Sequence, residues 1–268
     1  MVKSWAKAGA MARNLLSIAG YDPSGGAGVH LDILVFQRLG FRGYGILTSV
    51  TAQNTARVIK AAPLPRQLVR AQYDALAGEV RFAGIKIGMA GSMANLAEAA
   101  RILGRNPSLP RVVDPILRSS SGPRLIEAAA IPRFLRLLRG KATLITPNLD
   151  EASALAAGRR VRCLDDMKDA ARRIFDSSGI ACLVKGGHLG SEALDVLYDG
   201  REFTVFRHSR AGKNVHGTGC FLSAAILGYM AGGLDLEEAC RRGIALTVRS
   251  IRKAVPTGKG RAAFAFAV

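Results

Sequence analysis

The sequence contains little cysteine, little acidic charge and no long apolar run. Its four cysteines lie far apart in 268 residues and include no Cys-x-x-Cys pair, so the sequence indicates neither a zinc site nor a redox dithiol. Residues 1–10 lack the apolar core of a signal peptide, and no later stretch is apolar over a full bilayer width. We therefore expect a cytoplasmic protein without a membrane partner.

The composition is that of a globular protein with an excess of positive charge. Hydrophobic residues make up 49% of the chain and charged residues 22%, which excludes disordered, collagen-like and coiled-coil classes. Lys and Arg number 38 against 20 Asp and Glu, so the formal net charge is +18. Such a surface attracts nucleotides, phosphates or nucleic acid, and charge alone does not choose among them.

Short apolar runs alternate with longer stretches of helical spacing. Buried strands are predicted at 14–19, 83–87, 111–114, 142–146 and 180–184, and helices at 67–77, 94–103, 165–175 and 219–230. This alternation predicts a three-layer α/β fold, with a mostly parallel central sheet and helices on both faces. The segment 193–206, with Asp199-Gly200 at its centre, predicts a small antiparallel hairpin near an edge. We expect one domain over residues 13–268, preceded by a disordered extension over residues 1–12.

Two glycine-rich segments mark candidate ligand sites. The first, residues 20–28, follows a predicted strand, where glycines let backbone N–H groups approach a ligand closely, although an ordinary tight turn is an equal alternative. The second, residues 214–220, opens the apolar helix. Its successive N–H groups at a helix N-terminus are predicted to form an anion hole for a phosphoryl group, from Gly217, Thr218, Gly219 and Cys220.

Cys220 is the candidate catalytic group of that anion hole. The helix dipole is expected to lower the pKa of its thiol, so that a thiolate takes the proton of an attacking substrate hydroxyl. A lone cysteine near a helix is more often a small hydrophobe, and Cys163, Cys182 and Cys240 receive that interpretation.

Polar residues after three other predicted strands are candidate ligands of a cation and of phosphate. Asn148 and Glu151 can offer oxygens to one Mg²⁺, and Asp114 would join them from the neighbouring strand end. The alternative for Asn148 is a helix cap. Lys185 ends a strand before two glycines and can neutralise the phosphates of a donor.

Taken together, these segments resemble the hydroxymethylpyrimidine/phosphomethylpyrimidine kinases of thiamine biosynthesis, which are members of the ribokinase-like superfamily. The resemblance covers about residues 14–255 and depends on the segments 18–28, 51–55, 86–89, 113–115, 146–151, 184–188 and 216–224. It implies a kinase that uses ATP and Mg²⁺ to phosphorylate 4-amino-5-hydroxymethyl-2-methylpyrimidine, and then its monophosphate to the diphosphate.

The resemblance also implies roles for individual residues. Cys220 stands where many ribokinase relatives carry a catalytic Asp. The pyrimidine would contact Gln53, whose amide can donate to a ring nitrogen and accept from the exocyclic amine. Other expected contacts are Gly20, Asp32 and Met89 with substrate, Asn148, Lys185 and Thr218 with the phosphates of ATP, and Asp114 and Glu151 with the metal.

Several alternatives and secondary expectations stay open at this point. His30-Leu31 and Ala56-Arg57 depart from the family pattern at the substrate end, so a pyridoxal or pyridoxine kinase is the nearest rival. A rival of another class is a non-catalytic nucleic-acid-binding protein, suggested by the net charge and by Arg133, Arg136 and Arg139; the dispersed basic residues favour no specific nucleic acid. We also expect a homodimer, and a loop at 118–123 that closes over the phosphates.

Overall fold

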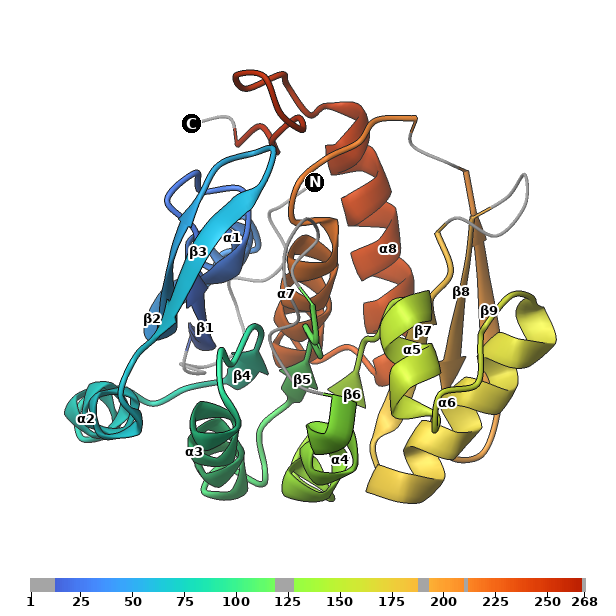
Figure 1. Cartoon of the computed structure of the whole chain (residues 1–268), viewed down its shortest axis with the longest axis horizontal. Coiled ribbons are helices and arrows are strands. Elements are labelled where there is room, and N and C mark those ends of the chain that lie inside the picture. Colours follow the sequence, from blue (N-terminus) through green and yellow to red (C-terminus); the bar gives the residue numbers. More distant parts are fainter. Residues whose placement is uncertain (1–12, 119–127, 188–192, 210–211, 267–268) are drawn as a thin grey trace.

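A nine-stranded sheet forms the centre of the computed structural model, which describes residues 13–118, 128–187, 193–209 and 212–266. The strand order is β3-β2-β1-β4-β5-β6-β7-β8-β9 (Figure 1). The strands are β1 (Asn14–Tyr21), β2 (Arg42–Gln53), β3 (Val58–Pro63), β4 (Gly84–Ile87), β5 (Arg111–Val113), β6 (Leu144–Ile145), β7 (Ala181–Lys185), β8 (Ala193–Tyr198) and β9 (Phe203–His208). The expected extension at 1–12 and most of the loop at 118–123 lie outside the described residues.

The pairing of the strands gathers several loops at one edge of the sheet. Strands β2, β1, β4, β5, β6 and β7 pair in parallel, whereas β3, β8 and β9 pair antiparallel to their inner neighbours. The predicted hairpin is confirmed as β8–β9, which ends the sheet, and Gly200 has a φ of 101° at its turn. The parallel strands all point their carboxyl ends toward the same edge, so the segments that follow them meet there.

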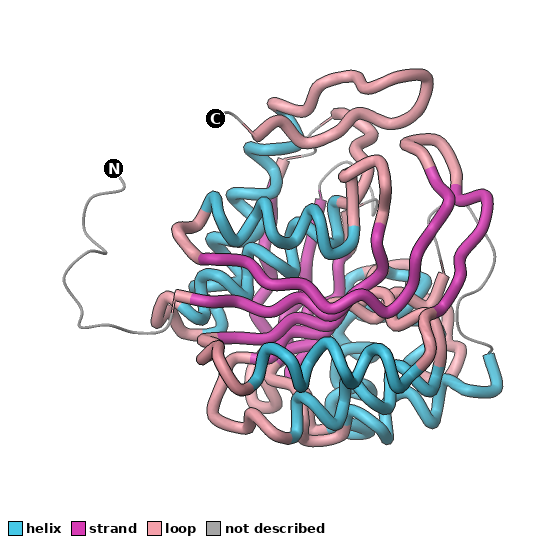
Figure 2. The backbone as a smooth tube through the Cα atoms, turned by 90° about the vertical axis from the view of Figure 1, so that its left-hand side faces the viewer, coloured by secondary structure: helices cyan, strands magenta, loops and turns pink. Residues whose placement is uncertain are grey.

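Eight α-helices in the described residues cover both faces of the sheet (Figure 2). Helices α1, α7 and α8 pack on one face, and α2 to α6 on the other. They are α1 (Gly28–Arg38), α2 (Arg66–Ala77), α3 (Met93–Gly104), α4 (Ile131–Leu138), α5 (Leu149–Leu155), α6 (Leu164–Ser178), α7 (Thr218–Ala231) and α8 (Leu236–Arg252). The predicted three-layer architecture is therefore confirmed.

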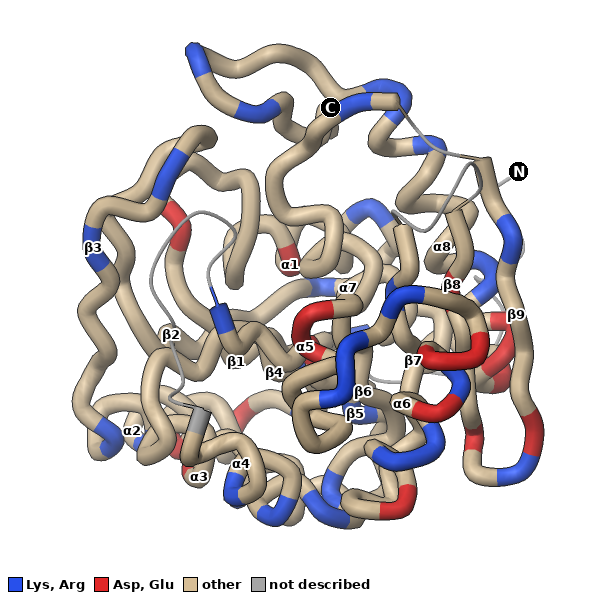
Figure 3. The backbone as a smooth tube through the Cα atoms, turned by 45° about the vertical axis from the view of Figure 1, so that its right-hand side comes forward, with Lys and Arg blue, Asp and Glu red and all other residues tan. Residues whose placement is uncertain are grey.

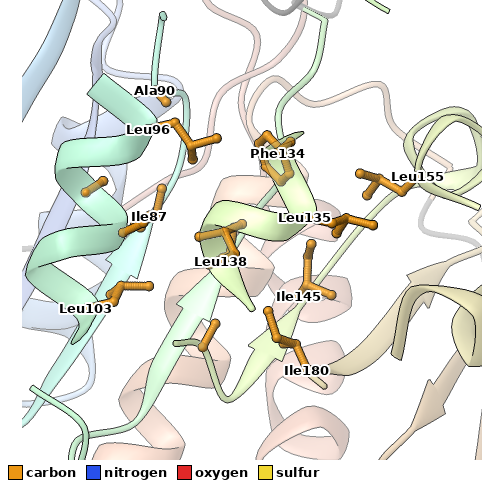
Figure 4. Close-up of a cluster of buried hydrophobic side chains, with 14 of the residues drawn as sticks. Ile87, Ala90, Leu96, Leu103, Phe134, Leu135, Leu138, Ile145, Leu155 and Ile180 are labelled. Carbon is orange, nitrogen blue, oxygen red and sulfur yellow. The ribbon is translucent and has the colours of Figure 1, made fainter. Parts of the chain in front are cut away.

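Each face of the sheet has its own apolar core. Figure 4 shows part of one core, where Ile87 of β4 and Ile145 of β6 lie near Leu96 of α3, and near Phe134 and Leu138 of α4. Strands buried on both faces need apolar residues at successive positions, which is why these strands are continuous apolar runs in the sequence. The core on the other face contains α7, which is buried nearly all round between the sheet, α1 and α8.

The β2–β3 hairpin was not predicted from the sequence. Exposed and buried residues are mixed along β2, so it lacks the continuous apolar run by which the inner strands were recognised. The two strands extend past the sheet as an arm beside β1 (Figure 1).

The basic residues are spread over many elements of the fold rather than collected on one (Figure 3). None of the helices in the described part of the chain has both the length and the apolarity to span a membrane.

Candidate active site

A cleft of about 800 Å³ lies at the carboxyl edge of the sheet. Strand β1 has β2 on one side and β4 on the other. The chain passes from β1 to β2 on one side and later returns from β3, through α2, to β4 on the other side, so the direction in which strands are added reverses at β1. Open α/β sheets bind ligands at such a switch point. The segments that follow β1, β2, β4, β5, β6 and β7 all contribute lining residues. The cleft therefore gathers residues as far apart in the sequence as Gly20 and Arg261.

The two glycine-rich segments pack directly against each other at the centre of the cleft. Gly217 has a φ of 77°, and a Cβ atom there would lie 2.0 Å from the carbonyl oxygen of Gly26. Gly28 has a φ of 66°, and its Cβ would lie 2.2 Å from the carbonyl oxygen of Gly20. No larger residue fits at these two positions without moving the backbone, so glycine is required for the two loops to meet.

The N-terminus of α7 faces the cleft. The helix begins at Thr218 with Gly217 as its N-cap, and no side chain caps its first turn. The first N–H groups of a helix have no carbonyl one turn earlier to bond, so those of Thr218, Gly219 and Cys220 can receive an anion. The predicted position of these residues, at the start of an apolar helix, is confirmed.

Cys220 is buried in the cleft wall, with 6% of its surface exposed. Burial raises the pKa of its thiol to about 12, while the Lys86 ammonium acts in the opposite direction. The expectation that the helix N-terminus lowers this pKa is therefore wrong for the free protein. The loss of water around the sulfur, together with the negative charges of Asp114 and Asp32, outweighs the Lys86 ammonium and the hydrogen bond with the Gly28 backbone.

Asp32 and Lys86 form an ion pair behind the wall of the cleft. Both side chains are fully buried, and the Lys86 ammonium donates to both Asp32 oxygens at 2.8 Å. The Ser17 hydroxyl donates to one of them at 2.5 Å. Burial raises the pKa of the Asp32 carboxyl, and the neighbouring ammonium opposes that shift. Asp32 is thus the counter-ion of Lys86 and is not among the residues that line the cleft.

A second ion pair lies in the cleft, beside the start of α7. The Lys185 ammonium donates to Oδ1 of Asp114 at 2.8 Å, and the Thr146 hydroxyl lies 3.3 Å from the same oxygen. A Cβ atom on Gly219 would lie 3.0 Å from the Lys185 nitrogen and 3.4 Å from Oδ2 of Asp114. Burial lowers the pKa of Lys185, but Asp114 and Glu151 outweigh it and hold that pKa above its ordinary value.

Asn148 and Glu151 form a reciprocal cap at the start of α5. The Asn148 side chain accepts from the Glu151 N–H, and Glu151 accepts from the Asn148 N–H, both at 2.9 Å. The cap considered for Asn148 is therefore present, and both residues also line the cleft. Burial raises the pKa of Glu151 to about 7, although the Lys185 ammonium acts against this.

The opposite end of the cleft contains the expected substrate residues Gln53, Gly20 and Met89. A Cβ atom on Gly20 would lie 2.2 Å from the terminal carbon of Met89, so this glycine leaves the space that the methionine fills. The amide nitrogen of Gln53 lies 3.2 Å from Nε2 of His216, which in turn lies 2.9 Å from the Asp22 carboxylate.

Three residues, two that line the cleft and one behind its wall, were not singled out as site residues from the sequence. Lys86 is a charged residue inside an apolar strand, which is a recognisable signal, but its partner Asp32 is 54 positions away. Asp22 and His216 belong to the two glycine-rich segments. Their contact, across 194 positions, depends on how those segments pack.

A family model described as phosphomethylpyrimidine kinase matches residues 22–265 of the chain. The chain belongs to the phosphomethylpyrimidine kinase family. The hydroxymethylpyrimidine/phosphomethylpyrimidine kinase of Aquifex aeolicus is 35% identical to it over 251 residues, which cover 91% of this chain and 96% of that protein.

Solved structures agree with this family membership. The phosphomethylpyrimidine kinase of Clostridium difficile superposes with a TM-score of 0.75 at 32% identity, over 89% of this chain and 99% of that one. The pyridoxal kinase of Staphylococcus aureus, solved with AMP-PCP and pyridoxal, superposes with a TM-score of 0.86 at 28% identity, over 96% and 94% of the two chains. The expected ribokinase-like fold is confirmed.

The burial of Cys220 predicts how the thiols of this kinase family member react. Cys163 is exposed, whereas Cys182, Cys220 and Cys240 are buried. At about pH 7 we expect a small thiol reagent to modify one cysteine rapidly in the native protein and four after unfolding. The Cys163→Ser variant should lose the rapid reaction. A second rapid thiol that disappears in Cys220→Ser would contradict the raised pKa of Cys220.

Proposed function

We propose that the chain phosphorylates 4-amino-5-hydroxymethyl-2-methylpyrimidine, and then its monophosphate, with ATP as the donor in thiamine biosynthesis. The observation that carries the proposal is the placement of three features in one cleft. These are the uncapped N-terminus of α7, the Lys185–Asp114 pair beside it, and Gln53 at the other end. Family membership supports the same activity.

The phosphates of ATP would bind between α7 and β7. The N–H groups from Gly217 to Cys220 are oriented toward an anion and need no reorganisation to receive one. Lys185 can neutralise charge on the transferred phosphoryl group, and Asn148 lies beside it at the end of β6. In-line transfer to the alcohol depends mainly on such positioning and charge stabilisation.

Asp114 and Glu151 would hold Mg²⁺ together with the phosphates. Their carboxylate oxygens are ligands that suit a Mg²⁺ ion that keeps phosphate and water ligands. Both residues line the cleft. Oδ1 of Asp114 is occupied by Lys185 and Thr146, and Oε2 of Glu151 accepts from the Asn148 N–H. Bound Mg²⁺ would neutralise phosphate charge at this position.

Cys220 is the proposed base that receives the proton of the substrate hydroxyl. Lys86 and the first N–H groups of α7 favour its thiolate, while burial keeps that thiolate scarce in the free protein. Only the thiolate form of Cys220 can accept this proton, so the thiol must first lose its own proton to solvent. In the loose transition state of phosphoryl transfer the attacking oxygen then gives up its proton to the thiolate only late.

Variants of Cys220 test this assignment. We expect Cys220→Ala to lose about 10²- to 10⁴-fold in kcat while KM for the pyrimidine stays near its wild-type value. Wild-type kcat should rise with pH through the neutral and alkaline range, because deprotonation of a thiol of high pKa limits it. Cys220→Asp, which carries the side chain found in many ribokinase relatives, should recover turnover and lose that rise. Near-normal kcat in Cys220→Ala would remove the residue from the mechanism.

A pyridoxal or pyridoxine kinase remains the second candidate, because the pyridoxal kinase structure superposes more closely than the phosphomethylpyrimidine kinase structure. We expect mass spectrometry of reactions with ATP and Mg²⁺ to detect mono- and diphosphate from the aminopyrimidine alcohol, and diphosphate from its monophosphate. Pyridoxine, supplied in parallel, should turn over more slowly. Phosphorylation of pyridoxine alone would favour the second candidate, and no product from any alcohol would contradict both.

We further propose that residues 13–268 act as one kinase domain in the cytoplasm. No specific nucleic acid is proposed as a partner, because the basic residues are dispersed over the fold (Figure 3).

A homodimer is proposed through the β2–β3 arm. Strand β3 is an edge strand, and Val50 and Ile59 are 42% and 67% exposed on the arm. Exposed apolar residues on an unpaired edge favour association. We expect sedimentation velocity to give twice the 28.4 kDa of one chain, and Val50→Lys with Ile59→Lys to give one chain. Leu68→Lys, at an equally exposed position on α2, is the control and should stay dimeric. A monomeric wild-type protein would contradict the proposal.

A further inference from the structure

Three side chains from three separate segments meet at the substrate end of the cleft. Asp22 follows β1, Gln53 ends β2, and His216 precedes α7. Nε2 of His216 lies 2.9 Å from Oδ2 of Asp22 and 3.2 Å from the terminal amide of Gln53. The Asp22 and His216 side chains are only 4% and 12% exposed, so water does not compete freely for these contacts.

Nε2 of His216 can donate a hydrogen bond to Asp22 only when it carries a proton, and it can accept one from the Gln53 amide only when it does not. A carboxylate only accepts hydrogen bonds, so a contact of 2.9 Å to Asp22 requires that Nε2 of His216 carries a proton. The other oxygen of Asp22 already accepts from the N–H and the hydroxyl of Ser24. These bonds and the one from His216 outweigh burial and lower the pKa of Asp22, so the carboxyl is ionised near neutral pH.

A protonated Nε2 fixes the orientation of the Gln53 amide. An N–H group cannot accept, so the Gln53 atom that faces His216 must be the oxygen, which can accept from the same N–H. The two ends of a side-chain amide have the same shape, and their identity is decided by the hydrogen bonds around them. The Gln53 NH₂ group is then turned away from His216.

Glycines hold His216 in this place. A Cβ atom on Gly26 would lie 2.5 Å from Cδ2 of His216, so the ring occupies space that only glycine leaves. The neighbouring Gly217 packs against the backbone of Gly26. The imidazole is therefore fixed by the contact between the two glycine-rich segments as well as by Asp22.

We propose that His216, held by Asp22, is a positioning residue that turns the Gln53 NH₂ group into the cleft, so that this end of the site selects substrates whose ring presents a hydrogen-bond acceptor. The proposal deepens the proposed function and rests on it for the identity of the ring. In the aminopyrimidine that acceptor is the ring nitrogen next to the carbon bearing the amino group. A site that presents a buried donor discriminates against a ring in which that nitrogen is replaced by C–H, because the donor is left unpaired.

The protonation of His216 can be measured without any substrate. In the intact protein labelled with ¹⁵N-histidine, the signals of His216 are those lost in His216→Gln. We expect them to show a proton on Nε2, with the proton directed at Asp22. A neutral ring that carries its proton on Nδ1 alone would overturn the proposal. Because this measurement needs no turnover, it stands even where the protein fails to phosphorylate the pyrimidine.

Kinetics with a matched pair of alcohols test the effect on selectivity. The pair is the aminopyrimidine alcohol and the aminopyridine alcohol in which the ring nitrogen is replaced by C–H. We expect wild-type kcat/KM to favour the pyrimidine by about tenfold or more, as for the loss of one buried hydrogen bond. His216→Phe should reduce this preference to near one through a higher pyrimidine KM, with KM for ATP changed less than about twofold.

Conservative variants and a double-mutant cycle separate positioning from a general structural role. His216→Gln keeps an N–H donor near the place of Nε2 and should restore most of the preference, whereas Asp22→Asn should weaken it. Adding His216→Phe to Gln53→Ala should change the preference less than about twofold, because the residue acts through Gln53. Full wild-type preference in His216→Phe, or additive losses in the double variant, would overturn the proposal.

The outcomes distinguish this proposal from the proposed function. Absence of any pyrimidine phosphorylation in the wild-type protein contradicts the function, and the ¹⁵N measurement then decides the protonation of His216 by itself. Wild-type phosphorylation of the pyrimidine with an Nδ1 proton on His216 contradicts the positioning role alone.

Discussion

The close approach of the two glycine-rich segments is the constraint on which the candidate site depends. Gly217 of one segment meets the carbonyl of Gly26 of the other at a distance that excludes any side chain, and within the first segment Gly28 meets the carbonyl of Gly20 in the same way. This contact brings the N-terminus of α7 to the carboxyl ends of β1 and β4 and leaves its first N–H groups open to the cleft. It also places His216 between the segments. A side chain at Gly217 would therefore disturb the anion site and the substrate end together.

Buried charge is the second organising feature of the cleft. Asp32 with Lys86, and Asp114 with Lys185, form two neutral pairs on either side of the start of α7. Burial, with the nearby negative charge of Asp114, raises the pKa of Glu151, although the Lys185 ammonium opposes this shift. A bound cation would change this balance by favouring the ionised form of Glu151.

The sequence predicted those parts of the fold and of the site that depend on local pattern. Continuous apolar runs predicted five parallel strands, and Asp199-Gly200 predicted the hairpin, because each follows from a few neighbouring residues. The positions of Asp114, Lys185 and Cys220 at strand ends or a helix start followed in the same way. The β2–β3 arm was missed because exposed and buried residues are mixed along it, so neither a continuous run nor an alternation stands out.

Contacts between side chains that are far apart in the sequence could not be predicted from local sequence patterns. Asp32 was expected at the substrate, but its partner Lys86 holds it behind the wall, and no spacing rule connects two residues on different elements. The contact of Asp22 with His216 was missed for the same reason, because it joins two segments that are distant in the sequence. The pKa of Cys220 was predicted from the helix dipole, a local effect, whereas the burial that decides it comes from α1, α8 and the sheet packing around α7.

The raised pKa of Cys220 has a consequence for a phosphotransferase that holds ATP in an open cleft. A base that is ionised in the free protein would also activate water, and ATP would then be hydrolysed without an acceptor. A thiol whose pKa is about 12 leaves water unactivated. An alcohol held in line with the phosphoryl group has an advantage over water because of its position. Its proton leaves late in a loose transition state, so the position of the alcohol matters more than early loss of that proton. With Cys220 as the proposed base, burial of the thiol would therefore favour transfer to a positioned acceptor over transfer to solvent. The proposed positioning groups, Gln53 and His216, would then set the specificity of the reaction.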